Sequence, residues 1–193
     1  VGIPCMLLDV TPAKLTEEEA AKGLTLENLS VRNRLAAAAV AKLKKTNPPP
    51  LYDEAFAERI TPGNLDDHLA SIGEADWVIE VVVENLGVKR ELLSRIERYW
   101  KPGTIVSSNT SGISIDAMSA QCGEDFRRHF MGTHFFNPPR YMKLLEIVPG
   151  RDTSPELIAR MKSFCENTLG KGVVLAKDTP NFVANRIGTY GML

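Results

Sequence analysis

Short apolar runs alternate with segments of helical periodicity along most of the chain. The runs over residues 4–10, 59–61, 77–83, 104–107, 130–136, 144–148 and 172–176 predict strands. Among them, the Trp-Val-Ile-Glu-Val-Val-Val run at 77–83 has the strongest strand character because it is mostly β-branched. Strands that alternate with helices are typical of an α/β fold with a largely parallel sheet, which we therefore predict.

Helix signals occupy the intervals between these runs. Thr11 and Pro12 are typical of a helix start, and the pattern remains helical to Lys45, before the Asn-Pro-Pro-Pro at 47–50 ends it. Further helices are predicted from Asn64 to Gly73, from about residue 88 to the Lys-Pro-Gly at 101–103, around 115–118, from 154 to 170, and after 178–181.

Polar residues lie at the carboxyl ends of several predicted strands. Asp9, Glu84, Ser111 and His134 all occupy such positions. Each alone could equally be a helix cap, a turn or a satisfied core residue. Because ligands of parallel sheets bind outside the carboxyl ends of the strands, the four together predict a ligand site at this edge.

His134 and Glu146 are candidates for an acid–base pair. Two short strands joined by a loop of roughly nine residues can bring these residues together, and period 2 places Glu146 on the face opposite Leu145 and Ile147. A carboxylate against one ring nitrogen fixes the tautomer and stabilises imidazolium, so the other nitrogen can take a proton. Oxidation of a secondary alcohol beside a nicotinamide needs such a base.

Composition and charge narrow the classes of function. The net charge of −1 and 24% charged residues give no reason to propose nucleic acid or a membrane surface as a partner. The longest apolar run is far shorter than the roughly 20 residues of a membrane span. Three widely spaced cysteines favour free thiols in the cytoplasm. The three histidines lack metal-ligand spacing, so no metal is predicted, and no G-x-S-x-G motif supports acyl-enzyme chemistry.

Five ordered motifs resemble one known family. They are Val-Val-Glu-Asn-Leu (82–86), Ser-Asn-Thr-Ser (108–111), His-Phe-Phe-Asn-Pro-Pro (134–139), Leu-Leu-Glu-Ile (144–147) and Lys-Asp-Thr-Pro-Asn-Phe-Val-Ala-Asn-Arg (177–186). Together they are similar to the NAD-binding domain of the 3-hydroxyacyl-CoA dehydrogenases of fatty acid β-oxidation. Residues 32–50 resemble most the long bacterial members that are fused to an enoyl-CoA hydratase module.

The resemblance implies a domain organisation. Residues 1–180 would form a Rossmann-type dinucleotide-binding domain with an inserted helical hairpin at about 12–47. Residues 181–193 would begin a helical C-terminal domain. The implied partners are NAD and an acyl-CoA, and the parent protein would be a homo-oligomer.

The resemblance also implies roles for the residues that match its motifs. His134 would be the base and Glu146 its paired acid. Ser111 would lie near both the substrate hydroxyl and the nicotinamide, Asn137 would hold the nicotinamide end of the cofactor, and Asn185 would contribute to the substrate site.

Other implied contacts lie farther from the reacting atoms. Asp9 resembles the acid that binds the adenosine ribose, and its charge would repel a 2′-phosphate, which favours NAD over NADP. Glu84 and Lys89 resemble cofactor contacts. Lys42 is the nearest candidate for an acyl-CoA contact in the hairpin, where the local pattern diverges from the family's.

Two departures from the family's pattern lead to further expectations. No G-x-G-x-x-G occurs in the sequence, and both ends read as cut, so we expect a piece of a longer protein that lacks the first strand and glycine-rich turn. Such a piece should bind NAD poorly, because the pyrophosphate would lose its helix N-terminus. Its sheet should also show a gap beside residues 4–9, with unpaired edges.

Two other interpretations stay open at the level of sequence. One is a dehydrogenase of a small 3-hydroxy acid, and the other is a non-catalytic remnant that keeps only the fold. The joint presence of His134, Glu146, Ser111, Asn137 and Asn185 favours the catalytic interpretation.

Overall fold

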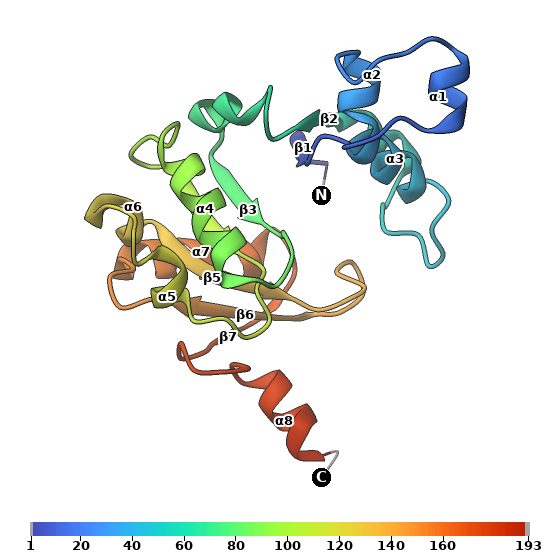
Figure 1. Ribbon diagram of the computed structural model, residues 1–193. Coiled ribbons are helices and arrows are strands. Elements are labelled where there is room, and N and C mark those ends of the chain that lie inside the picture. Colours follow the sequence, from blue (N-terminus) through green and yellow to red (C-terminus); the bar gives the residue numbers. More distant parts are fainter. Residues whose placement is uncertain (1, 192–193) are drawn as a thin grey trace. The chain divides into compact units, whose positions relative to one another are not determined.

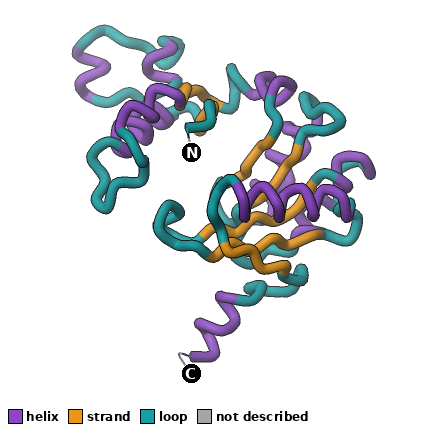
Figure 2. The backbone as a smooth tube through the Cα atoms, turned by 180° about the vertical axis from the view of Figure 1, so that it is seen from behind, coloured by secondary structure: helices purple, strands orange, loops and turns teal. Residues whose placement is uncertain are grey.

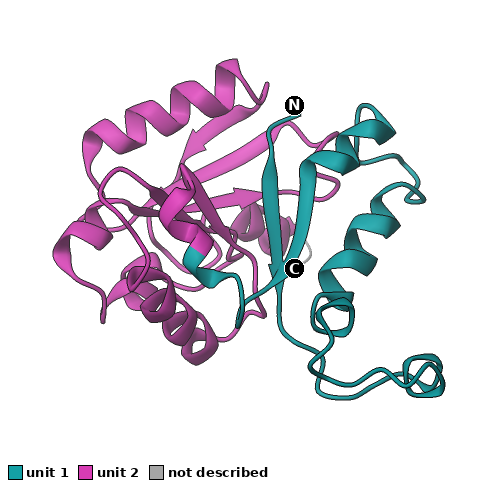
Figure 3. Cartoon of the chain, turned by 90° about the horizontal axis from the view of Figure 1, so that it is seen from above, with its two compact units in different colours: residues 1–70 teal, residues 71–193 magenta. Residues whose placement is uncertain are grey.

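The computed structural model describes residues 2–191. Residues 1–70 and 71–193 form two compact units, which are described separately (Figure 3). No helix within the described residues is both long and apolar enough to cross a membrane.

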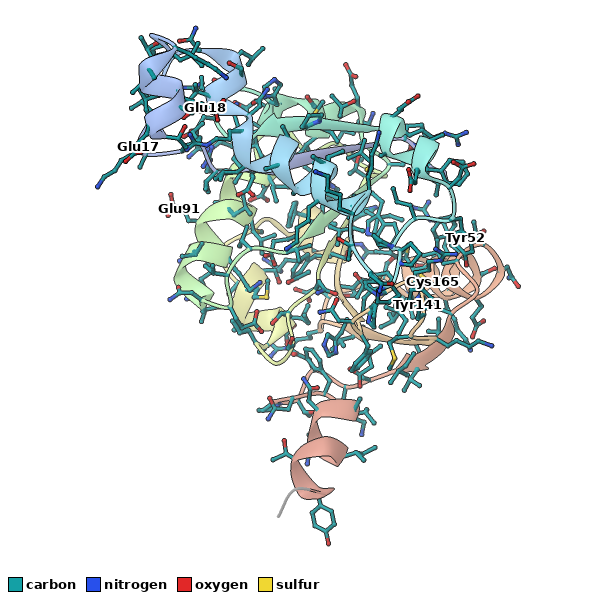
Figure 4. The ribbon with its side chains drawn as sticks, turned by 90° about the vertical axis from the view of Figure 1, so that its right-hand side faces the viewer. Glu17, Glu18, Tyr52, Glu91, Tyr141 and Cys165 are labelled. Carbon is teal, nitrogen blue, oxygen red and sulfur yellow. The ribbon has the colours of Figure 1, made fainter. Side chains whose placement is uncertain are left out.

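Unit 1 is built on two parallel strands. Strand β1 (Cys5–Asp9) pairs with β2 (Ile60–Asn64). The chain between them forms the helices α1 (Glu17–Ala21), α2 (Leu29–Arg32) and α3 (Arg34–Leu43) and the short 3-10 helix η1 (Glu54–Arg59). Glu17 and Glu18 extend from α1 into solvent (Figure 4).

The predicted helix start at Thr11 is wrong. Helix α1 begins after Thr16, whose hydroxyl accepts from the Glu19 N–H at 3.2 Å while the Glu19 carboxylate accepts from the Thr16 N–H at 2.8 Å. This reciprocal capping box satisfies two free N–H groups, whereas a proline after a threonine offers only a favourable φ. The predicted continuous helix is also interrupted after α1, where Gly23 has a φ of 69°.

The segment after β2 differs from its prediction as well. Asn64 caps a turn, as its Oδ1 accepts from the backbone N–H groups of Asp66 at 3.0 Å and Asp67 at 2.8 Å. The helical segment, η2 (Leu69–Glu74), begins later and is a 3-10 helix.

An ion pair in unit 1 predicts acid sensitivity. Arg32 donates to both Asp67 oxygens, at 2.6 and 2.7 Å, and Asn64 Nδ2 donates to Oδ2 at 2.9 Å. These bonds lower the pKa of Asp67 from 3.8 to about 2. Because the folded pKa lies below the unfolded one, the stabilisation is complete above about pH 4 and is lost as the pH falls towards 2.

We therefore expect Asp67→Asn to reduce the loss of unit 1 stability between pH 4 and pH 2. Amide NMR signals of residues 5–64, followed in urea at each pH, measure this stability. An unchanged pH dependence in the variant would contradict the assignment.

Unit 2 contains a five-stranded sheet (Figure 2). Its strands, in spatial order, are β3 (Trp77–Glu80), β4 (Ile105–Ser108), β5 (Phe130–Phe135), β6 (Leu144–Pro149) and β7 (Gly172–Leu175). Only β5 and β6 pair antiparallel, which confirms the predicted largely parallel α/β fold. The helices are α4 (Leu86–Glu97), α5 (Ile115–Ser119), α6 (Glu124–Arg128), α7 (Pro155–Asn167) and α8 (Ala184–Gly191). Helix α6, of five residues, was not predicted.

Helices pack on both faces of this sheet. One face carries Met131, Leu145 and Ile147, which pack against Met161 and Cys165 of α7. On the other face α5 lies so close that a Cβ on Gly132 would be 2.9 Å from Ile115 Cδ1. Since side chains alternate along a strand, residue 134 lies on the α5 face, as residue 132 does. Helix α8 extends away from the sheet (Figure 1).

Strand β3 is shorter than its prediction. It ends at Glu80, whose carboxylate accepts from the Val82 N–H at 2.6 Å and so turns the chain out of the sheet. Val81 and Val83, predicted as strand residues, are 67% and 68% exposed. Asn85 then caps α4 by accepting from the Val88 N–H at 3.1 Å.

The two sheets are separate within the described residues. Strand β1 pairs only with β2, and β3 pairs only with β4, so each has one edge without a strand partner. Such edges present free N–H and C=O groups to any strand that can reach them.

Candidate active site

The His134–Glu146 pair lies at the centre of the site. The two residues are direct register partners on antiparallel β5 and β6. His134 Nδ1 and Glu146 Oε2 are 2.7 Å apart, and the residues are 5% and 0% exposed. The proximity predicted from their spacing is confirmed. The carboxylate requires a donor, so Nδ1 carries a proton and Nε2 is the nitrogen left to accept one.

The second oxygen of Glu146 binds the start of helix α8. Glu146 Oε1 accepts from the backbone N–H groups of Val183 at 3.0 Å and Ala184 at 2.8 Å. These donors and the imidazole compensate a carboxylate that burial alone would disfavour. The same side chain therefore orients the imidazole and anchors the first turn of α8.

Two aromatic rings flank the imidazole. The ring centroids of Phe136 and Phe182 lie 4.4 and 5.9 Å from that of His134. Asn181 and Phe182 have φ values of 63° and 46°, which are uncommon for residues other than glycine. The same segment passes so close to Gly112 that a Cβ there would lie 2.8 Å from Asn181 Oδ1. Glycine at position 112 permits this approach.

The Ser-Asn-Thr-Ser loop connects the pair with α8. Asn109 Oδ1 accepts from the Phe135 N–H at 2.9 Å, next to His134. Asn185 Nδ2 donates to the Ser111 backbone oxygen at 3.0 Å. The structure thus brings His134, Glu146, Ser111 and Asn185 into one hydrogen-bonded arrangement, with the Ser111 residue exposed.

Asp178 fixes the other end of this loop. Its carboxylate accepts from Ser114 Oγ at 2.8 Å and from the N–H groups of Ile115 at 2.9 Å and Asp116 at 3.0 Å. It therefore caps α5 from a distant part of the chain. The sequence suggested only that residue 178 leads into the last helix, because nothing local identifies its partners.

Glu84 holds the Ser111 backbone from the opposite side. Its Oε1 accepts from Thr110 Oγ1 at 2.5 Å and from the Ser111 N–H at 2.8 Å, while Oε2 is 3.3 Å from Lys89 Nζ. Burial would raise the pKa of Glu84, but these hydrogen bonds and the ammonium outweigh it and lower the pKa. The side chain is 44% exposed, so an ionised carboxylate is available to hydroxyl donors.

The remaining predicted residues are distributed more widely. Asn137 is exposed on the loop after β5, and Lys89 is buried within α4. Asp9 and Lys42 belong to unit 1. Asp9 ends β1, where its Oδ1 accepts from the Val10 N–H at 2.7 Å, and Lys42 is exposed on α3.

Sequence comparison places this chain among known proteins. Residues 1–179 match the family described as "3-hydroxyacyl-CoA dehydrogenase, NAD binding domain". The chain is 55% identical over 193 residues to a probable 3-hydroxyacyl-CoA dehydrogenase of Bacillus subtilis, of which it spans 24%. It is 42% identical over 192 residues to a probable 3-hydroxyacyl-CoA dehydrogenase of Deinococcus radiodurans, of which it spans 51%.

Solved structures share the fold. The 3-hydroxybutyryl-CoA dehydrogenase of Escherichia coli matches with a TM-score of 0.67 at 30% identity, over 95% of this chain and 35% of that one. The (S)-3-hydroxybutyryl-CoA dehydrogenase of Ralstonia eutropha matches with a TM-score of 0.66 at 28% identity, over 94% of this chain and 58% of that one.

Proposed function

Because this chain belongs to the 3-hydroxyacyl-CoA dehydrogenase family, whose NAD-binding domain its residues 1–179 match, we propose that the protein oxidises an L-3-hydroxyacyl-CoA to the 3-ketoacyl-CoA. The observation that carries this proposal is the buried His134–Glu146 pair, with Nδ1 and Oε2 2.7 Å apart. It provides an oriented base of the kind that alcohol oxidation requires.

In this reaction His134 Nε2 takes the proton of the substrate hydroxyl. Glu146 stabilises the resulting imidazolium through Nδ1–H, so the proton has a place to reside while the carbonyl forms. NAD, when bound, supplies the acceptor for the hydride that leaves the hydroxyl-bearing carbon. The reverse reaction returns the same proton from His134 to the carbonyl oxygen.

Residues around the pair would position the two reactants. Ser111 and Asn185 are joined by a hydrogen bond beside α8, where they would bind the substrate oxygen. Glu84 and Asn137 are both exposed and would contact the cofactor, and the lowered pKa of Glu84 suits a carboxylate that accepts from ribose hydroxyls. The hydrogen-bonding groups at this edge of the sheet therefore suit NAD.

Three further contacts are proposed from the family's pattern. Asp9 would accept from the adenosine ribose, which favours NAD over NADP, and Lys42 would contact the acyl-CoA. Lys89 would support the cofactor side of the site. We also propose a cytoplasmic homo-oligomer, with free cysteines as one support for the compartment.

A substrate comparison tests the reaction. In the natural protein, purified from its source, kcat/KM for NADH-dependent reduction of acetoacetyl-CoA should exceed that for free acetoacetate by at least about tenfold. Following NADH absorbance measures both rates. A preference for the free acid would indicate a dehydrogenase of small 3-hydroxy acids, and absence of turnover with both would indicate a non-catalytic protein.

A further inference from the structure

A network of buried charges lies where β3 leaves the sheet, and no function was assigned to its Glu80 and Ser108. It contains Glu80 of β3, Lys89 of α4 and Ser108 of β4. We propose that Glu80 is a positioning residue for Ser111, acting through Lys89 and Ser108 on two converging routes. The catalytic part of this inference rests on the proposed dehydrogenase function.

The first route runs through Lys89. Its side chain is 1% exposed, and its Nζ lies 2.9 and 3.1 Å from the two oxygens of Glu80. The same ammonium donates to the Val82 carbonyl at 3.1 Å and lies 3.3 Å from Glu84 Oε2. Lys89 therefore binds Glu80 on one side and fixes Glu84 on the other. Its ammonium is surrounded by oxygens of the protein, so an effect on the cofactor would pass through Glu84.

The second route runs through Ser108. Glu80 and Ser108 are register partners on parallel β3 and β4, and Ser108 Oγ donates to Glu80 Oε2 at 2.5 Å. The same hydroxyl accepts from the Thr110 N–H at 3.1 Å. The backbone of Glu80 also participates, because its carbonyl accepts from the Asn109 N–H at 2.8 Å.

The two routes meet at Thr110, and the first also reaches Ser111. Glu84 Oε1 accepts from Thr110 Oγ1 and from the Ser111 N–H, while Ser108 holds the Thr110 N–H. The backbone of Ser111 is therefore fixed through its N–H by Glu84 and through its carbonyl by Asn185. A shift of Glu80 would move the loop on which Ser111 must meet the substrate.

Fold stability alone gives little reason for this arrangement. Buried ion pairs often can be replaced by apolar residues of similar volume without loss of stability, because desolvation offsets the attraction between the charges. Their hydrogen bonds do define a geometry that apolar residues cannot reproduce. In a reaction that needs reacting groups within a fraction of an ångström, a displacement of about 1 Å costs about 100-fold in rate.

The decisive variant combines Glu80→Met with Lys89→Met in the natural protein. It removes both charges together, so neither is left buried and unpaired. The matched control is Lys162→Met with Glu166→Met, which removes a lysine–glutamate pair on the exposed side of α7. Hydrogen exchange of peptides spanning residues 104–114, the thermal midpoint and steady-state kinetics are measured for each.

We expect the double variant to keep the thermal midpoint of the control. Its 104–114 peptides should exchange at least about tenfold faster, because the fixed acceptor at Glu84 is lost. Its kcat should fall about 10–100-fold, and the control's should not. Glu80→Gln should lower kcat in the unmodified protein and have a smaller effect when Glu84 is already glutamine, because the first route passes through Glu84 and only the route through Ser108 then remains.

Unchanged exchange of residues 104–114 would overturn the inference, and so would additive effects of Glu80→Gln and Glu84→Gln on kcat. If the double variant unfolds, hydrogen exchange of the 104–114 peptides in the Ser108→Ala variant is the test. This variant removes only the second route and should also exchange faster. The exchange measurement needs no turnover. An unmodified protein without dehydrogenase activity would therefore contradict the proposed function, while the exchange data still decide the positioning role.

Discussion

Replacing His134 with glutamine is expected to lower kcat for the 3-hydroxyacyl-CoA about 10²–10⁴-fold, while KM for substrate and cofactor changes little. Glutamine approximates the length of the imidazole, but its amide cannot take a proton near neutral pH. The loss should appear in kcat because proton transfer belongs to the transition state and contributes little to ground-state binding. Initial rates in both directions, with saturation curves for each reactant, measure the effects on kcat and on KM separately.

A second histidine in unit 2 serves as the control. His129 follows helix α6 and precedes β5, and its Nδ1 is 2.8 Å from the Asp125 carbonyl. His129→Gln should leave kcat within about twofold, as expected for a residue remote from the reacting atoms. A His134→Gln protein that keeps more than a tenth of the original kcat would show that another group is the base.

Replacing Glu146 with glutamine is expected to cost on the order of 10³–10⁴-fold in kcat, as removal of the orienting carboxylate does in other histidine-based sites. The amide oxygen can still accept from the Val183 and Ala184 N–H groups. The amide nitrogen then faces His134 Nδ1, which must become an acceptor. This tautomer carries its proton on Nε2, so the nitrogen that should act as base is already occupied.

Two measurements separate this effect from misfolding. The ¹⁵N chemical shifts of the imidazole report the tautomer directly, and the exchange rates of the Val183 and Ala184 amides report whether α8 keeps its anchor. Glu156→Gln, on the exposed first turn of α7, is the matched control and should leave kcat unchanged. An unaltered tautomer together with full activity would refute the pairing role of Glu146.

Sequence patterns formed by neighbouring residues predicted much of this structure. The two predicted strands at 130–136 and 144–148 were sufficient to predict that His134 and Glu146 can come together, and the antiparallel register then places them opposite each other. Helix α7 was likewise predicted from its end signals, Ser154 and Gly170. In the structure, Ser154 Oγ accepts from the Leu157 N–H, and Gly170 follows the helix with a φ of 67°.

Interactions between distant residues explain what the patterns missed. The run 77–83 has strand composition throughout, yet the strand ends at Glu80, where the carboxylate that pairs with Lys89 of α4 also accepts from the Val82 N–H. Asp178 is similar, because its three partners at 114–116 lie more than sixty residues earlier. Neither contact leaves a local signal in composition or periodicity.

The sharing of the Glu146 carboxylate between an imidazole and a helix has a thermodynamic consequence. One oxygen faces His134 and the other faces the first N–H groups of α8, on a single planar group. Any force that displaces α8 therefore also acts on the carboxylate that orients the imidazole. By reciprocity, a ligand that binds better to the oriented imidazole stabilises the seated position of α8 by the same amount.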